Sequence, residues 1–253
     1  MKTKKIILYA ILALSFVAAI VFSIPGLRLL ADERADTLLL RVLSLIGLSV
    51  FLICLAFLTK QTYLLRFPYK SFPRALVWSI PCFLVAIVNF PFYALITGNA
   101  VVEQASLVPL FLFMCILVGV SEELMFRGII HDFIKQKLRG KKNGYLYAVL
   151  LSAAVFALWH FVNLIYGAGI GDTLLQVGYS FLIGAMLAVT YDKNRNIWLC
   201  VFIHALFDFG GMLVEYLGKG NVHDTLFWVL TSVFGVLCAI HIILNALKLN
   251  KRL

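Results

Sequence analysis

The chain has 253 residues, of which 62% are hydrophobic and only 13% are charged, and its mean hydropathy is +0.98. Soluble domains are about half apolar and about a quarter charged, so this composition excludes an ordinary cytosolic enzyme, a disordered chain and a nucleic-acid-binding domain. The apolar residues form long blocks, which predicts a protein that crosses a membrane several times.

Eight apolar blocks approach or reach the roughly 20 residues that a membrane-spanning helix needs. They cover about 6–24, 38–59, 75–97, 105–128, 145–166, 173–190, 197–217 and 224–247. The first follows three lysines as a signal peptide does, but its apolar run exceeds the usual 7–15 residues of a cleaved signal. We therefore expect it to be retained, in an all-α polytopic membrane protein with eight transmembrane helices and a single membrane domain over residues 1–253.

Lysine and arginine are concentrated in alternate loops. One set of segments carries 18 of these residues and the opposite set carries 3. Basic residues favour the cytoplasmic side, so both termini are expected in the cytoplasm. This topology accounts for the formal net charge of +10. It favours contact with anionic lipids and requires no nucleic acid.

The five cysteines all lie inside apolar blocks and show no metal-binding spacing. They are Cys54, Cys82, Cys115, Cys200 and Cys238. Their odd number and apolar setting predict buried free thiols and no disulfide framework.

Ionisable side chains within membrane spans are functional candidates, because burying them in lipid is costly. The first group lies in Ser121–Arg127, near the end of the fourth block. Glu123 and Arg127 are four residues apart, so they can pair on one helix face. Glu122 lies about 100° further round the helix and is left to face elsewhere. The alternative is an interfacial charge cluster where the helix leaves the membrane.

Two further groups occupy the fifth and seventh blocks. His160 follows Phe156 at i+4, and a lone histidine in such a setting is more often a hydrogen-bonded core residue than a catalyst. His204 and Asp208 place an imidazole and a carboxylate on one face, which costs several kcal/mol unless they are well paired. At 1.5 Å per residue, His204 and Asp208 lie roughly 10–17 Å from the cytoplasmic end, and Glu122 roughly 10 Å. His160 is expected deeper, at roughly 22 Å.

This set of residues is suited to activating water. A buried glutamate such as Glu122 can serve as a general base, and a histidine can donate to the oxyanion that forms when water attacks an amide. Glu122, His160 and His204 are also candidates for zinc ligands. The HExxH motif of many zinc proteases is absent.

Three motifs in this order resemble the signature of the CAAX-protease and bacteriocin-processing (CPBP, or Abi) family, which includes the Ras-converting CAAX endopeptidases. They are EExxxR at 122–127, FxxxH at 156–160 and HxxxD at 204–208, within a matching region of about 100–217. The resemblance implies an intramembrane endopeptidase. By motif position, Glu122 would activate water with the help of His160, Glu123 and Arg127 would shape the site, and His204 and Asp208 would bind the oxyanion.

The resemblance favours a glutamate mechanism that requires no cofactor, with zinc as the alternative. Members have Asn or Asp at the last motif position, and an ionised carboxylate would repel an oxyanion. Asp208 is therefore expected either to be protonated or to orient His204 without touching substrate.

The resemblance also implies a peptide or membrane-associated substrate in a bacterial plasma membrane, with maturation of peptide signals or bacteriocins as a role that fits. The oligomeric state is left open. A non-proteolytic immunity or scaffold protein is one alternative, against which the intact Glu122, His160 and His204 argue. A transporter is another, against which the lack of an inverted repeat argues.

Overall fold

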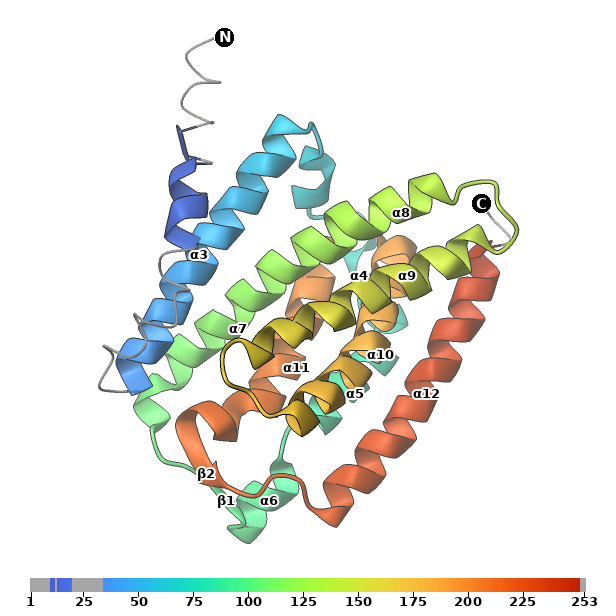
Figure 1. Cartoon of the computed structure of the whole chain (residues 1–253). Helices are drawn as coiled ribbons and strands as arrows, with labels where there is room; N and C mark the ends of the chain where they lie inside the picture. Colours follow the sequence, from blue (N-terminus) through green and yellow to red (C-terminus); the bar gives the residue numbers. More distant parts are fainter. Residues whose placement is uncertain (1–9, 12, 20–33, 251–253) are drawn as a thin grey trace.

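The computed structural model describes residues 10–11, 13–19 and 34–250, most of which are helical (Figure 1). Seven helical segments in this part of the chain are long and apolar enough to cross a membrane, which confirms an all-α, multi-pass membrane fold. They are Ala35–Leu58, Ile80–Thr97, Ala105–Lys137, Gly144–Leu164, Ile170–Asn194, Ile197–Leu217 and Thr225–Leu249. Of the first expected span, 6–24, only 10–11 and 13–19 are described, and these are helical. The eighth span and the orientation of the termini stay predictions.

The first half of the described chain holds one long helix followed by shorter ones. In order these are α3 (Arg34–Leu58), the turns η1 (Thr62–Leu65) and η2 (Tyr69–Ser71), α4 (Phe72–Trp78), α5 (Ile80–Val88) and α6 (Phe92–Thr97). The expected third span, 75–97, is therefore divided between α4, α5 and α6. Prolines cause the divisions, because Pro81 lies in the first turn of α5 and Pro91 directly precedes α6. Proline lacks the N–H that a continuous helix needs.

The second half carries all three motifs. Its elements are β1 (Ala100–Val102), η3 (Ala105–Leu107), α7 (Val108–Glu123), the π-helical turn η4 (Leu124–His131), α8 (Asp132–Lys137), α9 (Gly144–Trp159), η5 (His160–Leu164), α10 (Ile170–Asn194), α11 (Ile197–Leu217), β2 (Gly218–Gly220) and α12 (Thr225–Asn250). The segments α7, η4 and α8 form one continuous green helix in Figure 1. The fourth span thus continues to Lys137, beyond the expected end near residue 128.

The described helices pack around two large buried apolar clusters, and a third, small one contains Ala94, Ala100 and Val214. α7 packs between α3 and α11, α9 packs along α10, and α12 packs against α5 and α10. Leu187 and Cys200 belong to the larger cluster, and Phe111 and Leu213 to the smaller. All five cysteines are buried and free, as predicted.

Two glycines allow the helices that carry the motifs to approach closely. A β-carbon on Gly119 of α7 would lie 2.8 Å from the carbonyl oxygen of Val201 on α11. A β-carbon on Gly184 of α10 would lie 2.9 Å from the ring of Phe156 on α9. Small residues commonly permit such contacts between membrane helices. Both contacts lie next to motif residues, so the glycines help to set the spacing of the site.

A short antiparallel ribbon, which the all-α prediction omitted, joins two loops at one end of the bundle. Ala100 of β1 pairs with Gly220 of β2, and Val102 pairs with Gly218. A side chain at Gly218 would collide with the carbonyl oxygen of Val101, at 2.0 Å, so glycine is required there. The ribbon connects the segment before α7 to the end of α11.

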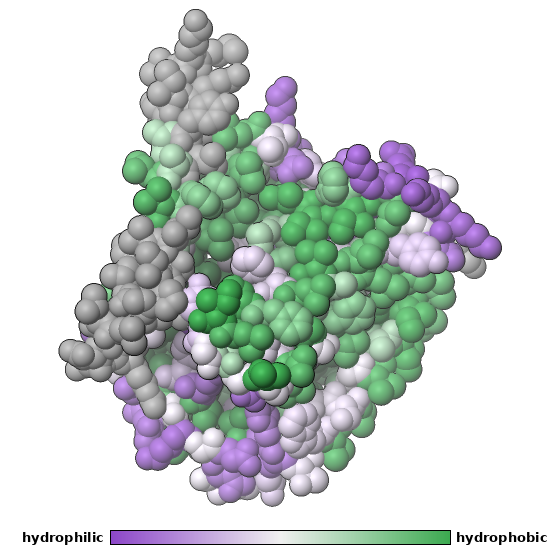
Figure 2. Space-filling model, in the orientation of Figure 1, coloured by the Kyte–Doolittle hydropathy of each residue, from purple (hydrophilic) through white to green (hydrophobic). Residues whose placement is uncertain are grey.

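The surface is consistent with a membrane environment. Figure 2 shows apolar side chains over the middle of the visible face and hydrophilic side chains toward two opposite ends. Many large apolar residues are exposed, including Ile165 and Val236 at 76% and 61%. Such extensive apolar exposure is unusual for a water-soluble monomer.

Candidate active site

The buried pair Glu123 and Arg127 joins the end of α7 to the π-helical turn η4. An Arg127 guanidinium nitrogen lies 2.9 Å from Glu123 Oε1, and both side chains are almost completely buried. The predicted i, i+4 pair is therefore confirmed. Arg127 also lies over the ring of Phe156, with 4.3 Å between its Cζ and the ring centre. The first motif thus contacts the second through a cation–π interaction.

His204 of α11 connects the third motif to the first. Its Nδ1 lies 2.7 Å from Glu123 Oε1. The imidazole must donate this hydrogen bond if Glu123 is ionised, as its pairing with Arg127 indicates, because a carboxylate only accepts. The other ring nitrogen, Nε2, lies 3.6 Å from Glu122 Oε2 and 3.5 Å from Asp208 Oδ2. Glu122, Glu123, His204 and Asp208 therefore form one cluster, as expected from the sequence.

The two adjacent glutamates have different environments. The Glu123 side chain is fully buried at 0% exposure, whereas that of Glu122 is 18% exposed. Glu123 Oε1 contacts both Arg127 and His204. Glu122 Oε2 is buried and has no hydrogen-bond partner among the described residues. Glu122 is thus the more accessible of the two carboxylates, and Glu123 is held between Arg127 and His204.

His160 stands at the junction of α9 and η5, on the other side of Phe156. The Phe156 ring centre lies 5.0 Å from that of His160 and 5.9 Å from that of His204, and both contacts are edge-on. A shared contact with Phe156 therefore brings His160 near His204, although counting residues along straight, parallel helices placed it deeper. His160 Nδ1 lies 3.0 Å from the Phe156 carbonyl oxygen and donates to it, which leaves Nε2 as the basic nitrogen.

The structure does not reproduce the ligand set suggested for zinc. Within residues 10–11, 13–19 and 34–250, no group of three or more His, Cys, Asp or Glu side chains is arranged to hold a metal ion. His204 directs Nδ1 to Glu123, which leaves its Nε2 on the side of Glu122 and Asp208. Zinc stays an alternative prediction, and we derive no step through a metal.

A second polar cluster, around His131, was not predicted from the sequence, because His131 lies beyond residue 128, where the fourth span was expected to end. His131 ends η4 and is completely buried. Its Nδ1 lies 2.9 Å from Ser152 Oγ, and its Nε2 lies 2.7 Å from Asp192 Oδ2. The continuation of the fourth span through η4 carries His131 into the bundle, where α9 and α10 supply its partners.

Asp192 is surrounded by further charged groups near the end of α10. It is paired with Lys135 and lies 3.1 Å from Arg195, while Lys135 also lies 2.9 Å from Asp132. Tyr63 donates to Asp132 across 3.0 Å. Burial and the negative charge of Asp132 raise the pKa of Tyr63, so its hydroxyl remains protonated at neutral pH. This second cluster links η1, α8, α9 and α10.

Comparison with known families identifies the segment that contains the site. Residues 104–210 match the family described as type II CAAX prenyl endopeptidase Rce1-like. The match confirms the resemblance to the CAAX-protease family and includes all three motifs. Comparisons with curated proteins and with solved structures returned no match.

Proposed function

We propose that this chain, whose residues 104–210 match a family of CAAX endopeptidases, is an intramembrane endopeptidase that uses Glu122 to activate water. One observation carries the proposal. The partly exposed Glu122, whose Oε2 has no hydrogen-bond partner among the described residues, lies beside the imidazole of His204, and the fully buried Glu123 holds that imidazole in place. A group of this kind can take a proton from water, while its neighbours remain fixed.

The proposed reaction is hydrolysis of one peptide bond. Glu122 removes a proton from water as the water oxygen bonds to the carbonyl carbon of the substrate. The C–N bond then breaks, and the proton held by Glu122 passes to the leaving nitrogen. The basic Nε2 of His160 is the assisting group, because the Phe156 carbonyl fixes the opposite nitrogen as the donor.

His204 is the proposed donor to the oxyanion. Its bond to Glu123 orients the ring, and its Nε2 points to the side where Glu122 and Asp208 lie. When Nε2 is protonated, it donates to the developing negative charge, which stabilises the transition state. We assign Asp208 the role of orienting His204 through their 3.5 Å contact, so Asp208 need not touch the substrate.

The position of the site supports a proposal for the substrate class. The site lies within membrane-spanning helices, which favours a membrane-associated peptide or protein. The name of the matching family refers to CAAX prenyl substrates. For this chain we propose maturation of peptide signals or bacteriocins in a bacterial plasma membrane, by a mechanism that needs no metal.

A comparison of cellular peptides tests the proposal and does not require an identified substrate. Cells would express wild type, Glu122→Gln or Glu215→Gln at equal levels, and their peptides would be identified by mass spectrometry. Glu215 is an exposed carboxylate on α11 and provides a matched control. We expect fragments that appear with wild type and Glu215→Gln but are absent with Glu122→Gln. Identical peptide sets for all three would contradict proteolysis. If Glu122→Gln also kept the biological phenotype, a scaffold function would be favoured.

A further inference from the structure

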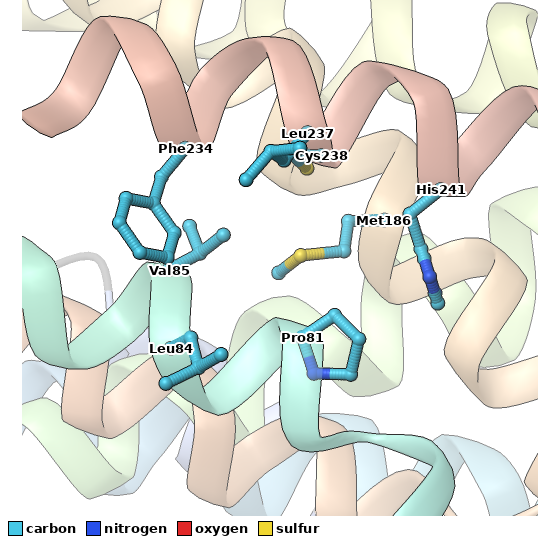
Figure 3. Close-up of a pocket in the computed structure, with 8 residues that line it drawn as sticks. All are labelled: Pro81, Leu84, Val85, Met186, Phe234, Leu237, Cys238 and His241. Carbon is cyan, nitrogen blue, oxygen red and sulfur yellow. The ribbon is translucent and has the colours of Figure 1, made fainter.

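An apolar recess lies between α5, α10 and α12, and none of the residues that line it belongs to a motif (Figure 3). Its cavity volume is about 70 Å³, and about 330 Å³ is free of protein atoms when the open mouth is included. Pro81 and Val85 of α5, Met186 of α10, and Phe234 and Leu237 of α12 supply apolar walls. Leu237 is 52% exposed, so the recess opens onto the apolar outer surface. In a membrane, lipid chains contact that surface.

One end of the recess is polar and cationic. His241 lines the recess itself, and Asn245 follows it one turn later on α12. The Lys193 ammonium, near the end of α10, lies 2.9 Å from Asn245 Oδ1 and 3.8 Å from the centre of the Trp78 ring. Tryptophan and lysine are typical of the level at which membrane helices meet lipid headgroups.

The same change from apolar to cationic runs along one face of α12. Phe234, Cys238, His241, Asn245 and Lys248 follow one another at alternating intervals of four and three residues. Residues at this spacing share one helix face. The face begins with an aromatic ring in the recess and ends with the exposed Lys248 in the last turn. Lys193 and Lys248 therefore lie toward the same end, which the distribution of basic residues assigns to the cytoplasm.

We propose that this recess binds an anionic phospholipid, with an acyl chain against Met186 and Phe234 and the phosphate near Lys193 and Lys248. The order of side chains along the recess matches the order of groups along such a lipid. The positive charge selects an anionic headgroup, since basic pockets between membrane helices bind such headgroups on the cytoplasmic side. A peptide segment or a second copy of the chain would not require cations at only one end. The proposal does not depend on the proteolytic activity.

Native mass spectrometry of the full chain in detergent tests the proposal directly. The protein would be mixed with phosphatidylglycerol or with phosphatidylcholine, and the retained lipid would be counted. We expect one tightly held phosphatidylglycerol and no comparable retention of phosphatidylcholine. The double variant Lys193→Gln/Lys248→Gln should bind phosphatidylglycerol more weakly, by about fivefold for each lysine removed. The control Lys141→Gln/Lys142→Gln changes two exposed lysines in the loop before α9 and should bind as wild type.

A second pair of variants tests the apolar part of the recess. Leu237→Trp adds bulk within the recess and should abolish retention, whereas Val236→Trp places the same ring on the opposite face of α12 and should not. Equal retention of both lipids, or equal binding by the lysine variant and its control, would overturn the anionic-lipid assignment. If the Leu237→Trp variant retained phosphatidylglycerol as well as wild type does, the lipid would bind outside the recess. If the wild type formed dimers and Leu237→Trp abolished them, the occupant of the recess would instead be a second copy of the chain.

Discussion

Two histidine–carboxylate clusters lie at opposite ends of the π-helical turn η4, and they differ in how completely their polar groups are paired. His204 and His131 each hold a carboxylate at 2.7 Å. His131 uses both ring nitrogens in hydrogen bonds. The Asp192 carboxylate accepts hydrogen bonds from His131, Lys135 and Arg195. By contrast, His204 Nε2 lies 3.5–3.6 Å from two carboxylates, and Glu122 is 18% exposed.

The comparison shows that two buried clusters of the same residue types can differ in how many of their polar groups are paired. A network in which the buried polar groups have hydrogen-bond partners stabilises one arrangement, because each partner compensates the desolvation of its neighbours. An ionisable group that is buried beside a rigid partner, but that still lacks some of its hydrogen bonds, can exchange protons with a reactant. η4 carries polar residues of both clusters within one stretch of helix, and π-helical turns are frequent at functional sites.

The largest expected difference between the clusters is in activity. His204→Leu should lower the rate of fragment release by roughly 100- to 1000-fold, because it removes the proposed oxyanion donor. Glu123 keeps its ion pair with Arg127, so the variant should still fold. Fragment release per folded molecule measures the effect. A rate close to wild type would remove His204 from the proposed mechanism.

Loss of Arg127 should have the largest effect on stability. Arg127→Met leaves Glu123 fully buried without its cationic partner, and breaking a buried pair in this way costs about 3–5 kcal/mol. The free energy of unfolding, measured with a denaturing detergent in mixed micelles, should fall accordingly. Glu103→Gln removes an exposed carboxylate that pairs with Lys219 and serves as the control. An equal loss in the control would indicate that burial of the pair contributes little.

In the cluster around His131, the matching substitution should lower the free energy of unfolding more than it lowers the rate of fragment release. His131→Leu removes hydrogen bonds to Ser152 and Asp192, while Lys135 and Arg195 still pair with Asp192. We expect the free energy of unfolding to fall by about 1–3 kcal/mol, the usual result of leaving buried polar groups unpaired. Fragment release per folded molecule should stay near wild type. A loss comparable to that of His204→Leu would mean that both clusters take part in catalysis.

The smallest effect is expected at Asp208. Asp208→Asn keeps the size and the hydrogen-bonding capacity of the side chain near His204, so most of the activity should remain. Parallel assays of Asp208→Asn and Asp208→Glu separate the possible roles. Loss of activity in the first with retention in the second would favour a metal ligand at this position.

Short-range features of this fold are predictable from the sequence, and long-range ones are less so. The pair Glu123–Arg127 follows from helical spacing alone. The contact of His204 with Glu123 bridges 81 residues and depends on how α7 and α11 approach at Gly119. The three motifs nevertheless indicated that these residues meet, because each placed ionisable groups inside a separate apolar block.

Two features of the structure were not predicted from the sequence, each for its own physical reason. The fourth span was ended too early because charged residues follow Glu122, yet η4 and α8 continue the helix and bury His131. Charges signal a helix end only where no partner neutralises them, and here Asp192 of α10 supplies that partner. Counting residues along straight, parallel helices also gave no sign that one side chain joins His160 to His204. The Phe156 side chain instead contacts both histidines.

The ribbon of β1 and β2 has a mechanical consequence for the proposed site. It fastens the segment before α7 to the end of α11, and the exposed ion pair of Glu103 with Lys219 spans the same junction. The helix that carries Glu122 and the helix that carries His204 therefore share one fixed end. Sliding of one along the other is restricted, which leaves pivoting about the ribbon as the least hindered relative motion. Changes in the distance between the two side chains would then arise at the opposite end of the bundle, where η1, α8 and α10 meet.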